Sequence, residues 1–190
     1  MVLVLPLLAG LALAPLVGGR WSRLGRLELR GIGVFYAAIA LQVVAFPAAR
    51  LPWRTPDRTA VALWLVSYAL FLVGLLRNAR VPGVPLVTAG LVANVGAIVA
   101  NGGHMPALPS ALRAAGLHFT QSRNSAALAH PHLGWLVDRW AAPDWVPWAN
   151  VFSVGDLLIA AGGLVFALAA TGAFRRRPAL PRHPVATSAS

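Results

Sequence analysis

The chain has 190 residues, of which 58% are hydrophobic and 11% charged, and its formal net charge is +11. Soluble domains hold about half apolar and a quarter charged residues, so this composition argues against a water-soluble core. The chain has no cysteine, which excludes disulfides and thiolate metal sites, and its 16 basic residues, all Arg, cluster beside apolar runs, so we predict no nucleic-acid partner.

Five apolar runs are each long enough to cross a bilayer, whose hydrocarbon core is about 30 Å thick. They predict an all-α fold, a polytopic membrane helix bundle in a bacterial cell membrane, with the lipid bilayer as its partner. We expect a single transmembrane domain over residues 1–172 and a disordered basic tail over 173–190. The predicted spans are 2–19, 31–49, 59–76, 82–100 and 153–172.

The first span, 2–19, lacks the basic start and the small-residue cleavage pattern of a signal peptide, so we expect it to be retained. Pro6 and Pro15 lie inside it and are expected to kink it.

Arginines are distributed unevenly between the two sides of these spans. One side holds Arg20, Arg23, Arg26, Arg30, Arg77, Arg80, Arg175, Arg176, Arg177 and Arg182. The other holds only Arg50, Arg54, Arg58, Arg113, Arg123 and Arg139. The positive-inside rule then predicts an outside N-terminus, a cytoplasmic C-terminus and an extracytoplasmic segment 101–149.

Small and polar residues inside the spans predict contacts between helices. Gly90, Ala93 and Ala97 in the fourth span, and Gly155, Gly162 and Gly163 in the fifth, permit close packing. Gln42, Asn94 and Asn101 carry amides that seek partners on a neighbouring helix when they lie in lipid.

The external segment is rich in tryptophan just before the last span. Leu133, Leu136, Val137 and Trp140 follow helical spacing, which predicts a short amphipathic helix on the outer leaflet. On such a helix Asp138 would lie opposite the apolar face, in solvent or beside an Arg.

Asp156 is an acidic residue inside an apolar span, and two hypotheses account for it. Ser153-Val-Gly-Asp156 fits a helix-start pattern, with Ser153 as a structural cap. Alternatively, Asp156 pairs with Asp138, and two close carboxylates then divide the roles of acid and base. Such a catalytic pair activates water against an amide or ester.

The histidines of the external segment, among them His130 and His132, form no helical pair and have no carboxylate cluster beside them. We therefore predict no metal and no cofactor.

Two motifs carry a family resemblance. With Asn101-Gly-Gly-His-Met-Pro106 after the fourth span and Asn150-Val-Phe-Ser-Val-Gly-Asp156 opening the last, the chain resembles a bacterial membrane family, domain of unknown function 5317. That resemblance implies no activity.

A more distant resemblance concerns Val137-Asp138 and Phe152-Ser-Val-Gly-Asp156, which are similar to the C-terminal motifs of lipoprotein signal peptidase, signal peptidase II. That family is a membrane aspartic protease acting on lipid-modified substrates at the outer face. The resemblance implies Asp138 and Asp156 as catalytic residues, and Asn101 as an orienting amide. Ser153, Gly155 and Leu157 depart from its pattern.

Three functional classes stay open from the sequence: a membrane aspartic hydrolase, a structural or partner-binding membrane subunit, and a small transporter or ligand-binding protein. The transporter is the least supported, because the spans carry no charge near the membrane midplane.

Overall fold

The computed structural model describes residues 4–47, 55–118, 124–143 and 150–174. It is mainly helical, which confirms the predicted helical class. The helices are α1 (Val4–Leu13), α2 (Ile32–Ala45), α3 (Asp57–Arg77), α4 (Val84–Ala100), the short α5 (Pro109–Ala114) and α6 (Val154–Ala170). The predicted tail over 173–190 lies, apart from its first two residues, outside the described residues.

Only α3 among the described helices combines the length and the apolar character needed to cross a membrane. It has 21 residues with a mean hydropathy of 2.2. The helices α2, α4 and α6 are apolar but have 14, 17 and 17 residues.

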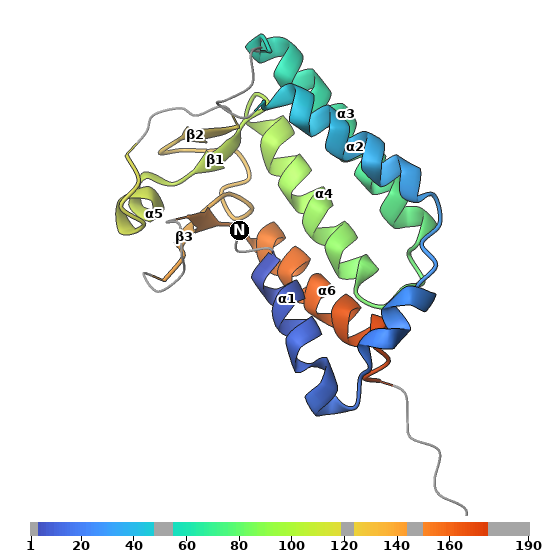
Figure 1. Ribbon diagram of the computed structural model, residues 1–190. Coiled ribbons are helices and arrows are strands. Elements are labelled where there is room, and N and C mark those ends of the chain that lie inside the picture. Colours follow the sequence, from blue (N-terminus) through green and yellow to red (C-terminus); the bar gives the residue numbers. More distant parts are fainter. Residues whose placement is uncertain (1–3, 48–54, 119–123, 144–149, 175–190) are drawn as a thin grey trace, which may run out of the picture.

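The long helices pack in the order α1, α6, α4, α3 and α2 (Figure 1). Neighbours in this arrangement are therefore not always neighbours in sequence, and α1 lies on the last helix. A polar bond joins α2 to α3, where Gln42 donates from Nε2 to Oγ of Ser67 at 3.1 Å. The predicted interhelical role of Gln42 is confirmed.

Glycines bring α4 and α6 into close contact. A Cβ on Gly90 would lie 2.8 Å from Cγ1 of Ile159, and one on Gly162 would lie 2.7 Å from the carbonyl oxygen of Gly83. Real Cβ atoms do not approach other atoms so closely, so no larger side chain fits at either position without movement. The close packing predicted for these glycines is confirmed.

Pro15 ends the α-helical part of the first apolar run. The chain continues as a 3₁₀ helix, η1 (Ala14–Val17), with Pro15 in its first turn. Proline has no amide hydrogen to give to the carbonyl four residues earlier. That carbonyl, of Leu11, instead accepts a hydrogen bond from the indole Nε1 of Trp21 at 2.8 Å.

The two ends of the helices differ in character. One end, called here the arginine end, carries Arg20, Arg23, Arg26, Arg30, Arg77 and Arg80. Two hydrogen bonds tie this end to the residues after α6: the amide of Arg20 donates to the carbonyl of Thr171 at 2.8 Å, and Nη1 of the Arg23 side chain donates to the carbonyl of Gly172 at 3.2 Å. Arg23 and Arg26 belong to the 3₁₀ helix η2 (Trp21–Arg26).

The opposite end carries two small sheets, and it is called here the strand end (Figure 1). β1 (Met105–Ala107) runs parallel to β2 (Ser125–Ala127). β3 (Trp140–Ala141) runs antiparallel to β4 (Val151–Phe152), which leads directly into α6.

The predicted amphipathic helix through Leu133 and Trp140 is wrong. Leu133 has a positive φ of 52°, the chain turns there, and Trp140 belongs to β3. Between them, the amide of Asp138 donates to the carbonyl of Pro106 at 2.9 Å. Pairing with residues distant in sequence therefore overrides a local spacing that imitates a helix.

Candidate functional site

Asp156 lies in the first turn of α6 and closes a reciprocal cap with Ser153. The backbone amide of Asp156 donates to Oγ of Ser153 at 3.1 Å, and the backbone amide of Ser153 donates to Oδ2 of Asp156 at 3.0 Å. These bonds satisfy two amides that the start of a helix leaves without partners.

Asn94 of α4 joins the same group from the neighbouring helix. Its Nδ2 donates to Oδ1 of Asp156, and its Oδ1 accepts from Oγ of Ser153, each at 2.9 Å. The interhelical partner predicted for this amide is confirmed. Gly155 makes room for it, because a Cβ there would lie 2.6 Å from Cγ of Asn94.

Asp138 reaches the site from the irregular segment of the strand end. Its side chain is 7% exposed, so the predicted solvated position is wrong. Two backbone bonds hold it beside β1: the amide of Asp138 donates to Pro106, and its carbonyl accepts from the amide of Leu108 at 2.9 Å. The amide of Arg139 donates to the carbonyl of Phe152 at 3.1 Å, which ties the same segment to β4.

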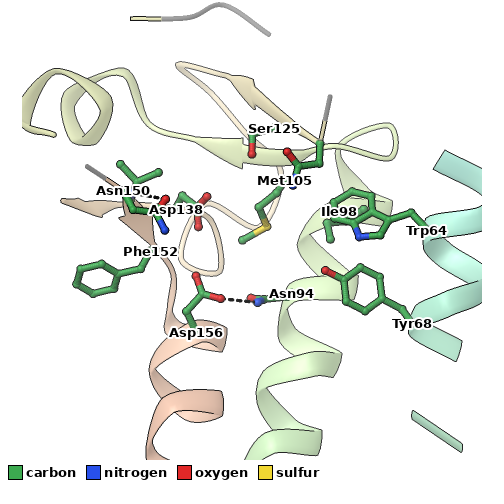
Figure 2. Close-up of a pocket in the computed structure, with 12 residues that line it drawn as sticks. Trp64, Tyr68, Asn94, Ile98, Met105, Ser125, Asp138, Asn150, Phe152 and Asp156 are labelled. Carbon is green, nitrogen blue, oxygen red and sulfur yellow. Dashed lines mark hydrogen bonds between the residues drawn. The ribbon is translucent and has the colours of Figure 1, made fainter. Parts of the chain in front are cut away.

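Asp138 and Asp156 face one pocket of about 190 Å³ at the junction of the helices and the strand end. Figure 2 shows both carboxyl groups directed into it, Asp156 from α6 and Asp138 from the segment above. The other lining residues are Trp64, Tyr68, Asn94, Ile98, Met105, Asn124, Ser125, Asn150, Val151 and Phe152. The structure therefore brings together the two aspartates that the sequence singled out.

Burial, and secondly the negative charge of Asp156, raise the pKa of the Asp138 carboxyl from 3.8 to about 8. Burial acts because a charged carboxylate loses its hydration, and a second carboxylate nearby further disfavours ionisation. At neutral pH Asp138 is therefore mostly a protonated acid that can donate a hydrogen bond. Asp156, in contrast, accepts hydrogen bonds at both carboxyl oxygens.

Asn101, the predicted orienting amide, does not line this pocket. Its Nδ2 donates to the carbonyls of Ala97 and His132, and its Oδ1 accepts from the amide of His132. Asn101 thus fastens the external segment to the end of α4. Asn94, two helical turns earlier on the same face, supplies the amide that holds Asp156.

Several pocket residues were not singled out by the sequence, among them Tyr68 and Trp64 from α3. Their rings lie 5.3 Å apart and form part of the wall (Figure 2). Aromatic residues in an apolar helix resemble any other core residue, so the sequence held no signal for their position at the site.

Among the described residues, no group of three or more His, Asp and Glu side chains is placed to hold a metal ion.

No curated protein sequence and no solved structure is significantly similar to the chain. A family described as "Family of unknown function (DUF5317)" matches residues 26–168, which include α2, α3, α4 and both aspartates of the pocket. Since this match covers most of the sequence, the chain belongs to the family of unknown function DUF5317.

Proposed function

We propose that the chain is a multi-pass membrane protein that hydrolyses an amide or ester bond with Asp138 and Asp156 as its acid–base pair. The observation that carries this proposal is the single pocket that both carboxyl groups face. Their environments differ, one being buried with a raised pKa and the other held by two hydrogen-bond donors. Carboxyl pairs with divided roles are a recurring solution to acid–base catalysis near neutral pH.

In the proposed reaction, Asp156 removes a proton from a water molecule as the water oxygen attacks the substrate carbonyl carbon. Protonated Asp138 donates its proton to the carbonyl oxygen. The tetrahedral intermediate then returns that proton to Asp138 as the C–N or C–O bond breaks. The leaving amine or alcohol takes the proton that Asp156 had removed, so both carboxyl groups return to their starting states.

The membrane placement is supported by apolar side chains on the outside of the helices. Leu8, Ile39, Val66, Val92 and Leu157 come from five different helices, and all are exposed. In water such a surface is unfavourable, whereas in lipid it costs nothing. The arginine end corresponds to the cytoplasmic side under the positive-inside rule, so the carboxylate pocket would face the outside of a bacterial cell membrane.

The proposed substrate is a membrane-embedded or lipid-modified peptide, as the resemblance to signal peptidase II implies. A pocket at the edge of an apolar helical layer suits such a substrate, because its scissile bond lies close to its lipid anchor. In that resemblance Asp138 and Asp156 stand where the family has its paired aspartates, whereas Ser153 and Gly155 depart from its pattern.

The test uses purified full-length protein in micelles with a set of diacylglyceryl-modified peptides, and product masses as the readout. We expect Asp138→Asn and Asp156→Asn each to lower the rate at least about 100-fold, as loss of a general acid or base does. Asp57→Asn, an exposed carboxylate of α3, is the matched control and should keep full activity. Undiminished cleavage by Asp156→Asn would return Asp156 to the role of a helix cap.

The alternative is a non-catalytic membrane subunit, and one observation favours it. Both oxygens of Asp156 are already bonded within the contact between α4 and α6, so the residue has a structural task. If this is its only task, Ser153→Ala and Asp156→Asn should affect the stability of the protein alike. No peptide of the set would then be cleaved by the wild-type protein.

A further inference from the structure

A second pocket lies at the arginine end of the helices, remote from the carboxylates. Its volume is about 470 Å³, larger than that of the carboxylate pocket. The turn between α3 and α4 forms one wall and the segment before α2 forms the other. Its charged residues are Arg30, Arg77, Arg80 and Glu28.

A buried amide fixes the two walls of this pocket to each other. Asn78, 5% exposed, accepts from the amide of Arg30 at 2.9 Å through Oδ1. Its Nδ2 donates to the carbonyls of Arg30 at 2.9 Å and Gly74 at 2.8 Å. The backbone at Arg30 and at the end of α3 is therefore held in place, although the side chains of Arg30 and Arg77 are exposed.

The charge of the pocket is strongly positive. Three guanidinium groups are accompanied by one carboxylate, that of Glu28. Arg77 extends back over Gly31, where a Cβ would lie 3.3 Å from its Nη1. Guanidinium groups bind phosphate oxygens through paired N–H donors, so the pocket suits a phosphate or phosphodiester.

The rim of the pocket is apolar on its helical side. Leu76, 57% exposed, lines the pocket. Val73, also exposed, lies one turn earlier in α3, on the side away from the pocket. A ligand with a phosphate in the pocket would thus have an apolar helix surface beside it. A free phosphate ion makes no use of such a surface, whereas a phospholipid does.

We infer that this pocket binds the headgroup of an anionic phospholipid, whose acyl chains run along the Val73 and Leu76 side of α3. Basic residues beside a membrane surface attract anionic lipids by about 1 kcal/mol each, which is about fivefold in affinity per arginine. This site rests on the membrane placement proposed above but not on the hydrolase activity. Its test requires no substrate.

The experiment titrates the delipidated full-length protein in neutral detergent with dioleoylphosphatidylglycerol and follows thermal unfolding by tryptophan fluorescence. We expect the lipid to raise the unfolding midpoint, and Arg77→Gln/Arg80→Gln to weaken its apparent affinity at least about tenfold. Arg58→Gln/Arg113→Gln removes the same charge from exposed positions at the strand end and should retain wild-type affinity. Arg80→Gln alone, an exposed change, should weaken it about fivefold and serves if the double variant does not fold.

Three results would overturn the inference. An equal midpoint shift with dioleoylphosphatidylcholine would show that the anionic headgroup is not recognised. An equal shift with inorganic phosphate alone would identify a site for a free anion. Equal loss of affinity in the two double variants would show that only overall charge matters, and not this pocket.

Discussion

Asn94 donates to Asp156 across the contact between α4 and α6 at 2.9 Å, and its carbonyl oxygen accepts from Ser153 at the same distance. One amide therefore holds both members of the helix cap that presents Asp156 to the pocket. The candidate site is thus built into the packing of two helices, and its integrity and the stability of this contact are linked.

Asn94→Leu should lower the free energy of unfolding by about 1–3 kcal/mol, because it removes the donor to Oδ1 of the half-buried Asp156 and the acceptor for the hydroxyl of the buried Ser153. Gln42→Leu is the comparison, since it removes a bond between two neutral groups, Gln42 and Ser67. Its cost should be smaller, about 0.5–1.5 kcal/mol. Chemical denaturation in micelles measures both, and an equal cost would show that the carboxylate adds nothing to the Asn94 contact.

Gly155→Ala should separate α4 from α6 and destabilise the protein, because the new Cβ would lie 2.7 Å from the carbonyl oxygen of Gly90 as well as against Asn94. Gly96→Ala in α4 is the matched control, since no atom lies within 4 Å of its added Cβ. That control should be neutral or stabilising by up to about 1 kcal/mol. Thermal unfolding of both variants decides whether steric contact, and not helix propensity, causes the loss of stability in Gly155→Ala.

The raised pKa of Asp138 makes stability depend on pH in a defined direction. The unfolded chain releases the proton near its ordinary pKa of 3.8, whereas the folded protein keeps it up to about 8. The folded state therefore binds more protons between these values, and stability should fall as pH rises from about 4 to about 8.

Asp138→Asn should remove this decline, and Asp57→Asn should leave it intact. Unfolding midpoints measured across that pH range provide the check. A decline of unchanged slope in Asp138→Asn would assign the effect to another group.

The proposed orientation predicts the side of the membrane reached by two reporter fusions. Fusions after residue 30 and after residue 178 should both report cytoplasm, because they follow arginine clusters. A fusion after residue 117, in the external segment, should report the outside. An external signal at residue 30 or 178 would contradict the assignment of the arginine end to the cytoplasm.

The predicted spans overlap α1, α2, α3, α4 and α6, because apolar runs depend mainly on local composition, whereas the short α5 was not predicted. The sequence also indicated the Ser153 and Asp156 pattern, since a helix cap involves residues three apart. It failed at Asp138, whose burial arises from backbone pairing with Pro106 and Leu108, residues far away in the sequence. Helical spacing at Leu133 and Trp140 cannot reveal such pairing.

Nor does the sequence indicate which of the two amides, Asn94 or Asn101, lies beside Asp156. The two residues share one face of α4, and only the packing of α6 decides which of them lies beside Asp156. The terminal amide of the helix, at Asn101, instead meets the backbone of His132.

The most direct test of the paired carboxylates is the titration of the aspartate side chains by NMR, with ¹³C at the carboxyl carbons. The chain has only four aspartates, Asp57, Asp138, Asp144 and Asp156, so the signals can be assigned with single Asn variants. We expect one carboxyl to titrate near pH 8, to vanish in Asp138→Asn and to titrate at lower pH in Asp156→Asn. If the Asp138 carboxyl instead titrates near pH 4 and ignores the Asp156 substitution, the two groups do not form an acid–base pair.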